Sequence, residues 1–139
     1  MTLRSKSLAV LVAALAATIT ACSGPKAADL FSVARSGNVP GAALTLVVRD
    51  DGSVTCNGVS HSLPDPLLLE ARQLQRDMAK DAGARLNLPP GAQPVFRYAV
   101  RSPDGSLSFS DDSPGQHAEL NTLAYLTRRV AREVCGLVR

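Results

Sequence analysis

The sequence predicts an α+β domain in which two helices cover one face of a four-stranded, mostly antiparallel sheet. Two pairs of segments alternate apolar and polar residues, as β-strands do, and each pair is joined by a turn sequence rich in Asp and Gly. Each pair is followed by a segment whose apolar residues recur at helical spacing. The predicted order is therefore β-β-α-β-β-α, with both helices on the same face of the sheet.

The first hairpin is predicted over residues 43–56. Every second residue from Leu44 to Val48 is apolar, Asp50-Asp51-Gly52 supplies the turn, and the alternation resumes as far as Cys56. A loop containing His61 is expected to follow.

The first helix is predicted over about residues 66–82. Asp65 is a candidate N-cap, Pro66 suits the first helical position, and Gly83 suits the C-terminal end. The apolar residues of this segment form one stripe: Leu67, Ala71, Leu74, Met78 and Ala82.

The second hairpin is predicted over residues 96–109, with its turn at Ser102-Pro103-Asp104-Gly105. The last helix is expected to begin at Pro114, because Ser113 and Gln116 have the spacing of a capping box, and to end at Gly136. Its apolar stripe consists of Leu120, Leu123, Ala124, Thr127, Val130, Ala131 and Val134.

The N-terminal residues have the layout of a secretory signal. Arg4 and Lys6 precede an apolar stretch from Leu8 to Ile19. About twelve residues span roughly 18 Å as a helix, well short of the roughly 30 Å hydrocarbon core of a bilayer. We therefore interpret residues 1–21 as a signal peptide, residues 22–40 as a tether, and residues 41–139 as a single domain.

The residues at the end of this stretch, Ile19-Thr20-Ala21-Cys22, resemble the lipobox of bacterial lipoproteins. The resemblance implies that a diacylglyceryl group is attached to the Cys22 sulfur and that the chain is cut just before this residue. Two acyl chains are enough for stable anchoring. The expected location is the extracytoplasmic face of the cell membrane, with membrane lipid as a partner through acylated Cys22.

The charge balance does not favour nucleic acid as a partner. Without the signal peptide the chain retains 13 basic and 12 acidic side chains, a net charge of about +1. It has no Trp, and Phe and Tyr together number five, so stacking surfaces for bases are scarce.

Two cysteines remain once Cys22 is assigned to lipid. Cys56 and Cys135 form an even pair in an exported chain, which favours a disulfide. The alternatives are a zinc site, for which the chain lacks ligands at suitable spacing, and a catalytic thiol, for which it lacks a recognisable motif.

No catalytic residue, cofactor or metal site is predicted, and the chain is not expected to be an enzyme. Its only histidines are His61 and His117, for which solvated or capping roles are the simpler interpretation. Asp111, Asp112, His117 and Glu119 could assemble a weak divalent-metal site, but a helix start favours acidic residues in any case.

Three arginines of the last predicted helix, Arg128, Arg129 and Arg132, lie off its apolar stripe. They could touch anionic lipid headgroups or an acidic partner. A solvated helix face explains them equally well.

One stretch, about residues 42–75, resembles the strand-to-helix region of the Streptomyces subtilisin inhibitor family, small secreted α+β proteins that block serine proteases. The resemblance is carried by three groups of residues: Ala43-Leu44-Thr45-Leu46 with Val54-Thr55-Cys56, then His61 with Pro64-Asp65-Pro66, then Ala71 and Leu74. The chain departs from the family in lacking paired glycines after Cys56, in having Arg72 near the expected helix cysteine, and in having no second cysteine pair.

These observations lead to three hypotheses for function. The first is a non-catalytic interaction module that binds an unknown envelope protein. The second is a protease inhibitor and the third a small ligand-binding lipoprotein. The possible contact loop is residues 87–94, beginning with Asn87, Leu88, Pro89, Pro90 and Gly91. Because no disulfide braces this loop, protease inhibition is not expected. Hydrolase activity is not expected either, because the chain has no Gly-x-Ser-x-Gly motif.

We predict that the mature chain begins at an acylated Cys22. Mass spectrometry of the membrane fraction should recover this N-terminus, and Cys22→Ala should release or misprocess the protein. Recovery of an unmodified Cys22 inside an intact mature chain would contradict the prediction.

Overall fold

The computed structural model describes residues 27–138, so the predicted signal peptide and Cys22 lie outside the described residues. The elements follow one another in this order: β1 (Asp29–Gly37), β2 (Leu44–Arg49), β3 (Ser53–Cys56), β4 (Val59–Ser62), α1 (Asp65–Asp77), α2 (Ala79–Gly83), β5 (Phe96–Ser102), β6 (Gly105–Ser110) and α3 (Ala118–Glu133).

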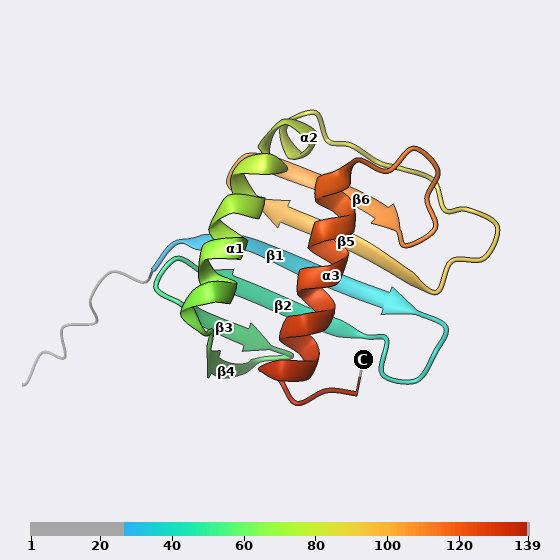
Figure 1. The fold of residues 1–139 in the computed structure, drawn as a ribbon. Helices are drawn as coiled ribbons and strands as arrows, with labels where there is room; N and C mark the ends of the chain where they lie inside the picture. The colour runs from blue at the N-terminus through green and yellow to red at the C-terminus, as the bar shows by residue number, and fades with distance from the viewer. Residues whose placement is uncertain (1–26, 139) are drawn as a thin grey trace, which may run out of the picture.

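The fold is α+β, and its sheet is antiparallel. In the described residues the sheet has six strands instead of the predicted four, in the order β4-β3-β2-β1-β5-β6. The two longer helices, α1 and α3, lie side by side across one face of this sheet, and α2 lies at its β6 end (Figure 1). The two predicted hairpins correspond to β2–β3 and β5–β6.

The first missed strand is β1, which we had assigned to the tether. Residues 29–37 form the strand at the centre of the sheet, paired with β2 on one side and with β5 on the other. Phe31, Val33 and Arg35 point toward the helices and are buried, while the residues between them face the other way. The domain therefore begins near Asp29, because this strand supplies the pairing that joins the two predicted halves.

The second missed strand is β4, which replaces the predicted loop around His61. The dipeptide Asn57-Gly58 has positive φ at both residues, 48° and 85°. Such a turn matches the twist of two hairpin strands, so the chain folds straight back from β3 into β4. His61 pairs in register with Val54.

The hydrophobic core lies between the helices and the sheet. Helix α1 buries Leu67, Ala71 and Leu74 of the predicted stripe, together with Leu68. The single helix predicted over 66–82 is divided at the buried Met78 into α1 and α2. The rings of Tyr98 on β5 and Phe109 on β6 stack with their centroids 4.9 Å apart. Burying each large apolar side chain contributes about 1.5–3 kcal/mol to folding.

The predicted disulfide is confirmed. Cys56, at the end of β3, is bonded to Cys135, just beyond α3, with the two Cα atoms 5.9 Å apart. The bond joins residues 79 positions apart and so ties the β3–β4 side of the sheet to the last helix.

We predict that removing this bond lowers stability without changing the fold. The double variant Cys56→Ser with Cys135→Ser should lose about 2–5 kcal/mol of unfolding free energy, because its unfolded chain is no longer constrained. Urea unfolding followed by circular dichroism measures the loss, with Cys22→Ala as the control that keeps the bond. Equal unfolding midpoints in the double variant and the control would contradict the prediction.

Candidate functional site

The predicted contact loop connects α2 to β5 and begins by pairing with the sheet. The Leu88 N–H donates to the Ser108 carbonyl at 2.9 Å, and the Ser108 N–H donates to the Leu86 carbonyl at 2.9 Å. The Ser108 hydroxyl also donates to the Asn87 side-chain oxygen at 2.6 Å. Residues 86–88 therefore lie along the outer edge of β6, and the rest of the loop projects from a fixed start.

The middle of the loop is held by one carboxylate. Asp112 accepts hydrogen bonds from the Gly91 N–H at 2.9 Å and from the Gln93 N–H at 2.8 Å, one on each carboxylate oxygen. A Cβ atom on Gly91 would lie 2.3 Å from the Asp112 carbonyl oxygen, closer than real side chains approach. Glycine at position 91 is therefore required for this contact.

The end of the loop is held by the neighbouring carboxylate. One oxygen of Asp111 accepts from the N–H groups of Val95 and Phe96, at 3.0 and 3.2 Å. Hydrogen bonds to a charged acceptor are stronger than those between neutral groups. The two adjacent aspartates thus fix the loop from Gly91 into the first residue of β5.

A second layer of contacts holds the aspartates themselves and corrects the predicted start of the last helix. The Ser113 hydroxyl accepts from the Ser110 N–H at 2.8 Å, and the Gln116 amide donates to the carbonyls of Ser110 and Asp111 at 2.9 and 3.1 Å. Ser113 and Gln116 brace this turn instead of forming a capping box. Gly115 has a φ of +73°, which is incompatible with a helix, so α3 begins at Ala118.

The exposed residues of the loop are mostly apolar, apart from the amides of Asn87 and Gln93. Residues 87–95 contain no acidic, basic, hydroxyl or thiol side chain. Pro90, Pro94 and Val95 help to line a shallow pocket of about 270 Å³, whose other wall includes Gly37 and Asn38 at the end of β1. The loop can therefore offer a partner shape, apolar contact and backbone groups, but no catalytic group of its own.

Arg35 contacts Phe96, one of the residues that line this pocket. Its Nε donates to the Ala42 carbonyl at 2.8 Å, and its guanidinium lies 4.9 Å from the centre of the Phe96 ring. Burial lowers the pKa of Arg35 from its ordinary value, and burial raises the pKa of the neighbouring Tyr98. Arg35 thereby links the β1–β2 turn to the first residue after the loop.

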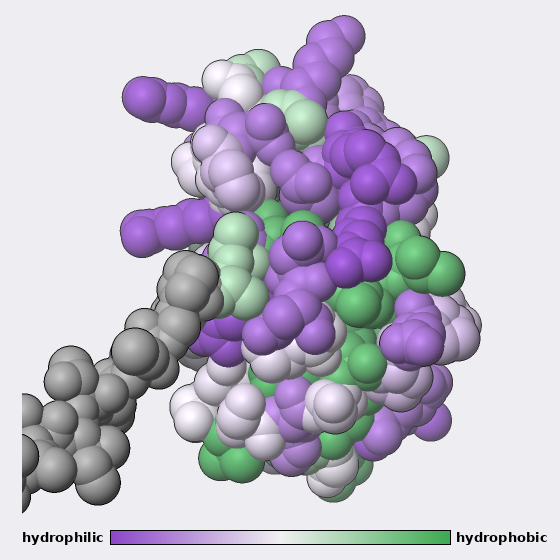
Figure 2. Space-filling view, turned by 90° about the vertical axis from the view of Figure 1, so that its left-hand side faces the viewer, coloured by the Kyte–Doolittle hydropathy of each residue, from purple (hydrophilic) through white to green (hydrophobic). Residues whose placement is uncertain are grey.

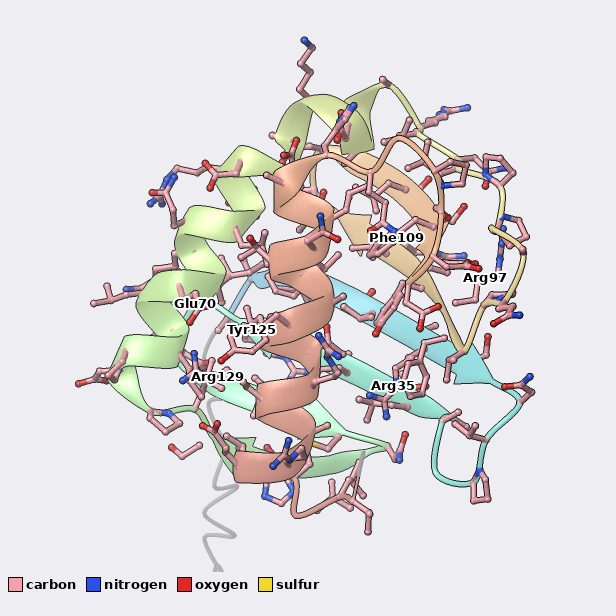
Figure 3. The ribbon with its side chains drawn as sticks, turned by 45° about the vertical axis from the view of Figure 1, so that its right-hand side comes forward. Arg35, Glu70, Arg97, Phe109, Tyr125 and Arg129 are labelled. Atoms are coloured by element: carbon pink, nitrogen blue, oxygen red, sulfur yellow. A yellow bond between two sulfur atoms is a disulfide. The ribbon has the colours of Figure 1, made fainter. Side chains whose placement is uncertain are left out.

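The arginines of α3 fall into two kinds. Arg129 lies between the helices, donating to Glu70 of α1 at 3.0 Å and lying 5.7 Å from the Tyr125 ring centre (Figure 3). Arg128 and Arg132 are exposed and help to line an open pocket of about 410 Å³. One of the three predicted surface arginines is thus an interhelical contact.

The structure separates the residues that the sequence had grouped as a possible metal site. Asp111 and Asp112 bind the loop backbone, as described above. His117 at the N-cap of α3 instead meets Asp81 of α2, with His117 Nδ1 2.7 Å from Asp81 Oδ2, and Glu119 lies nearby. Asp81 was missed, because only the folded chain brings α2 to the start of α3.

No protein-family model, curated protein or solved structure matches this chain. Within residues 27–138, no helix is sufficiently long and apolar to cross a membrane.

We predict that Asp111 and Asp112 protect different amides of the loop. Asp112→Ala should speed hydrogen exchange at Gly91 and Gln93 by about 10- to 100-fold, the equivalent of a charged hydrogen bond of about 1.5–3 kcal/mol. Residue-resolved NMR exchange measures this.

Asp111→Ala is the matched control, because it should deprotect Val95 and Phe96 and leave Gly91 and Gln93 slow. If both variants deprotect the same four amides, the loop opens as one unit and the separate roles are wrong.

Proposed function

We propose that this chain is a lipid-anchored envelope protein whose domain is a non-catalytic interaction module, and that the loop of residues 87–95 binds its protein partner. The observation that carries the proposal is the exposed, mostly apolar loop held by Asp111 and Asp112. A loop that is already ordered loses little conformational entropy on binding. Pro89, Pro90 and Pro94 reduce that entropy further.

The position of the loop relative to the proposed anchor supports the same function. The chain enters the domain at Asp29, and β1 extends nine residues to Gly37, about 30 Å in a strand. Phe96, at the end of the loop, pairs with Gly37. The loop therefore lies at the far end of the sheet from the point where the chain enters it (Figure 1).

The start of the domain lies close to the proposed lipid anchor in the sequence. Asp29 lies seven positions after Cys22, a length of chain that spans at most about 25 Å. The surface around the start of β1 is largely hydrophilic, with smaller apolar patches (Figure 2). Such an arrangement suits a domain whose entry end faces the lipid headgroups while its loop points into the envelope space.

A second candidate function is inhibition of a serine protease. One observation favours it: the loop is braced on both halves by carboxylates, although residues 27–138 contain no second disulfide. Titration of subtilisin and trypsin with the protein separates the candidates. Stoichiometric inhibition at nanomolar concentration would replace the interaction module with an inhibitor, whereas cleavage within residues 87–94 would leave the module in place.

We predict that the loop is the point of contact in native membranes. A photo-crosslinking amino acid at Ala92, the exposed residue between the two amides held by Asp112, should yield one adduct of defined mass. The same amino acid at Leu69, which is 62 % exposed on α1, is the control and should yield none.

Adding Asp112→Ala should reduce the Ala92 adduct, because the loop must then be ordered on binding. Equal adducts from Ala92 and Leu69 would contradict the proposed binding site.

A further inference from the structure

A second cluster of polar side chains lies where α2 meets the start of α3. It consists of Asp81, His117 and Glu119, and one ligand atom from each lies within 4.8 Å of the other two. His117 Nδ1 is 2.7 Å from Asp81 Oδ2 and 3.7 Å from Glu119 Oε1. These residues play no part in the contact loop's hydrogen bonds.

The cluster combines two carboxylates with little positive charge. Asp81 is only 7 % exposed, and His117 is the only hydrogen-bond or ion-pair partner of its carboxylate among residues 27–138. Glu119 likewise has an ion pair with His117 alone in this part of the chain. Burying a carboxylate is costly unless a cation offsets its charge. A divalent ion held by all three side chains would offset the charge of both carboxylates at once.

We propose that Asp81, His117 and Glu119 form a binding site for a divalent transition-metal ion of the Zn²⁺ class. An imidazole nitrogen with two carboxylate oxygens is a ligand set that such ions accept, whereas Mg²⁺ and Ca²⁺ prefer oxygen ligands throughout. The ion would lie between the three ligand atoms, which are within 4.8 Å of one another.

Two of the three distances between ligand atoms are near those of a metal site. Ligand bonds to Zn²⁺ of about 2.0–2.2 Å place neighbouring ligand atoms about 3.3–3.6 Å apart in a tetrahedral site. The distances of 2.7 and 3.7 Å from Nδ1 lie on either side of this range, and the Asp81 and Glu119 oxygens lie within 4.8 Å of each other. The His117 side chain is 51 % exposed, which leaves an open side for water as a further ligand.

The ion would join two segments that control the contact loop. The Asp81 carbonyl accepts from the Leu86 N–H at 3.0 Å, at the start of that loop. His117 directly follows the turn that holds Asp111 and Asp112. Metal binding would therefore tie the beginning of the loop to its brace, whether or not the loop binds a protein partner.

The test is isothermal titration of the full-length chain in detergent with Zn²⁺ at about pH 7.5, where ligands must be deprotonated to bind. The expected result is one saturable site per chain and a rise in the thermal unfolding midpoint with added Zn²⁺. Loss of even an outer partner weakens metal binding by about 10- to 100-fold, so His117→Ala should weaken it by at least that much. His61→Ala is the matched control and should bind normally.

Asp81→Asn keeps the shape of the side chain at position 81 and removes its negative charge. This variant can therefore be used to test the site if His117→Ala fails to fold. Absence of a saturable site in the unmodified chain, as expected if the cluster holds only a proton, would overturn the proposal. The proposal would also be overturned if Asp81→Asn bound Zn²⁺ as tightly as the unmodified chain. The same holds if His61→Ala alone lost Zn²⁺ binding.

Discussion

The hydrogen bonding of β1 along both of its edges is the constraint on which the rest of the structure depends. The strand pairs with β2 from Asp29 to Arg35 and with β5 from Ser32 to Gly37. Without it, the β2–β3–β4 and β5–β6 groups would be two small sheets, each too small to bury its share of the core. With it, α1 and α3 pack on one continuous surface, and β5 is placed so that the loop before it meets the end of β1.

The sequence predicted the elements whose signals are local and missed those that depend on distant partners. Helix α1 and the two hairpins follow from apolar spacing and turn residues. β1 was missed because its apolar residues, Leu30, Phe31 and Val33, form only a brief patch without sustained periodicity, and the next inward position of the strand is the charged Arg35. Only the folded chain shows that turn carbonyls at Gly41 and Ala42 and the ring of Phe96 accommodate its guanidinium. β4 had a local signal, the Asn57-Gly58 turn, which we did not weigh.

In the candidate site too, the features with local signals were predicted and those that depend on distant residues were missed. Proline content and position identified residues 87–94 as an exposed loop, and the Cys56–Cys135 bond followed from cysteine arithmetic. The brace could not be predicted, because Asp111 and Asp112 act on amides 15 to 21 residues away. Ser113 and Gln116 have the spacing of a capping box, but Gly115 between them has a positive φ, which an α-helix does not allow. Acidic residues that resemble metal ligands in the sequence thus serve as acceptors for backbone amides.

The segment of residues 86–88 also affects how molecules of this protein meet one another. A sheet edge with unpaired backbone groups is a template on which another chain can add a strand, and this is how many β-proteins aggregate. Here the segment occupies the middle of the outer edge of β6 through Ser108. At the opposite edge, β4 is four residues long and carries the hydroxyl side chains of Ser60 and Ser62. Edge-to-edge pairing between molecules is thus discouraged at both sides of the sheet, because one edge is covered and the other is short.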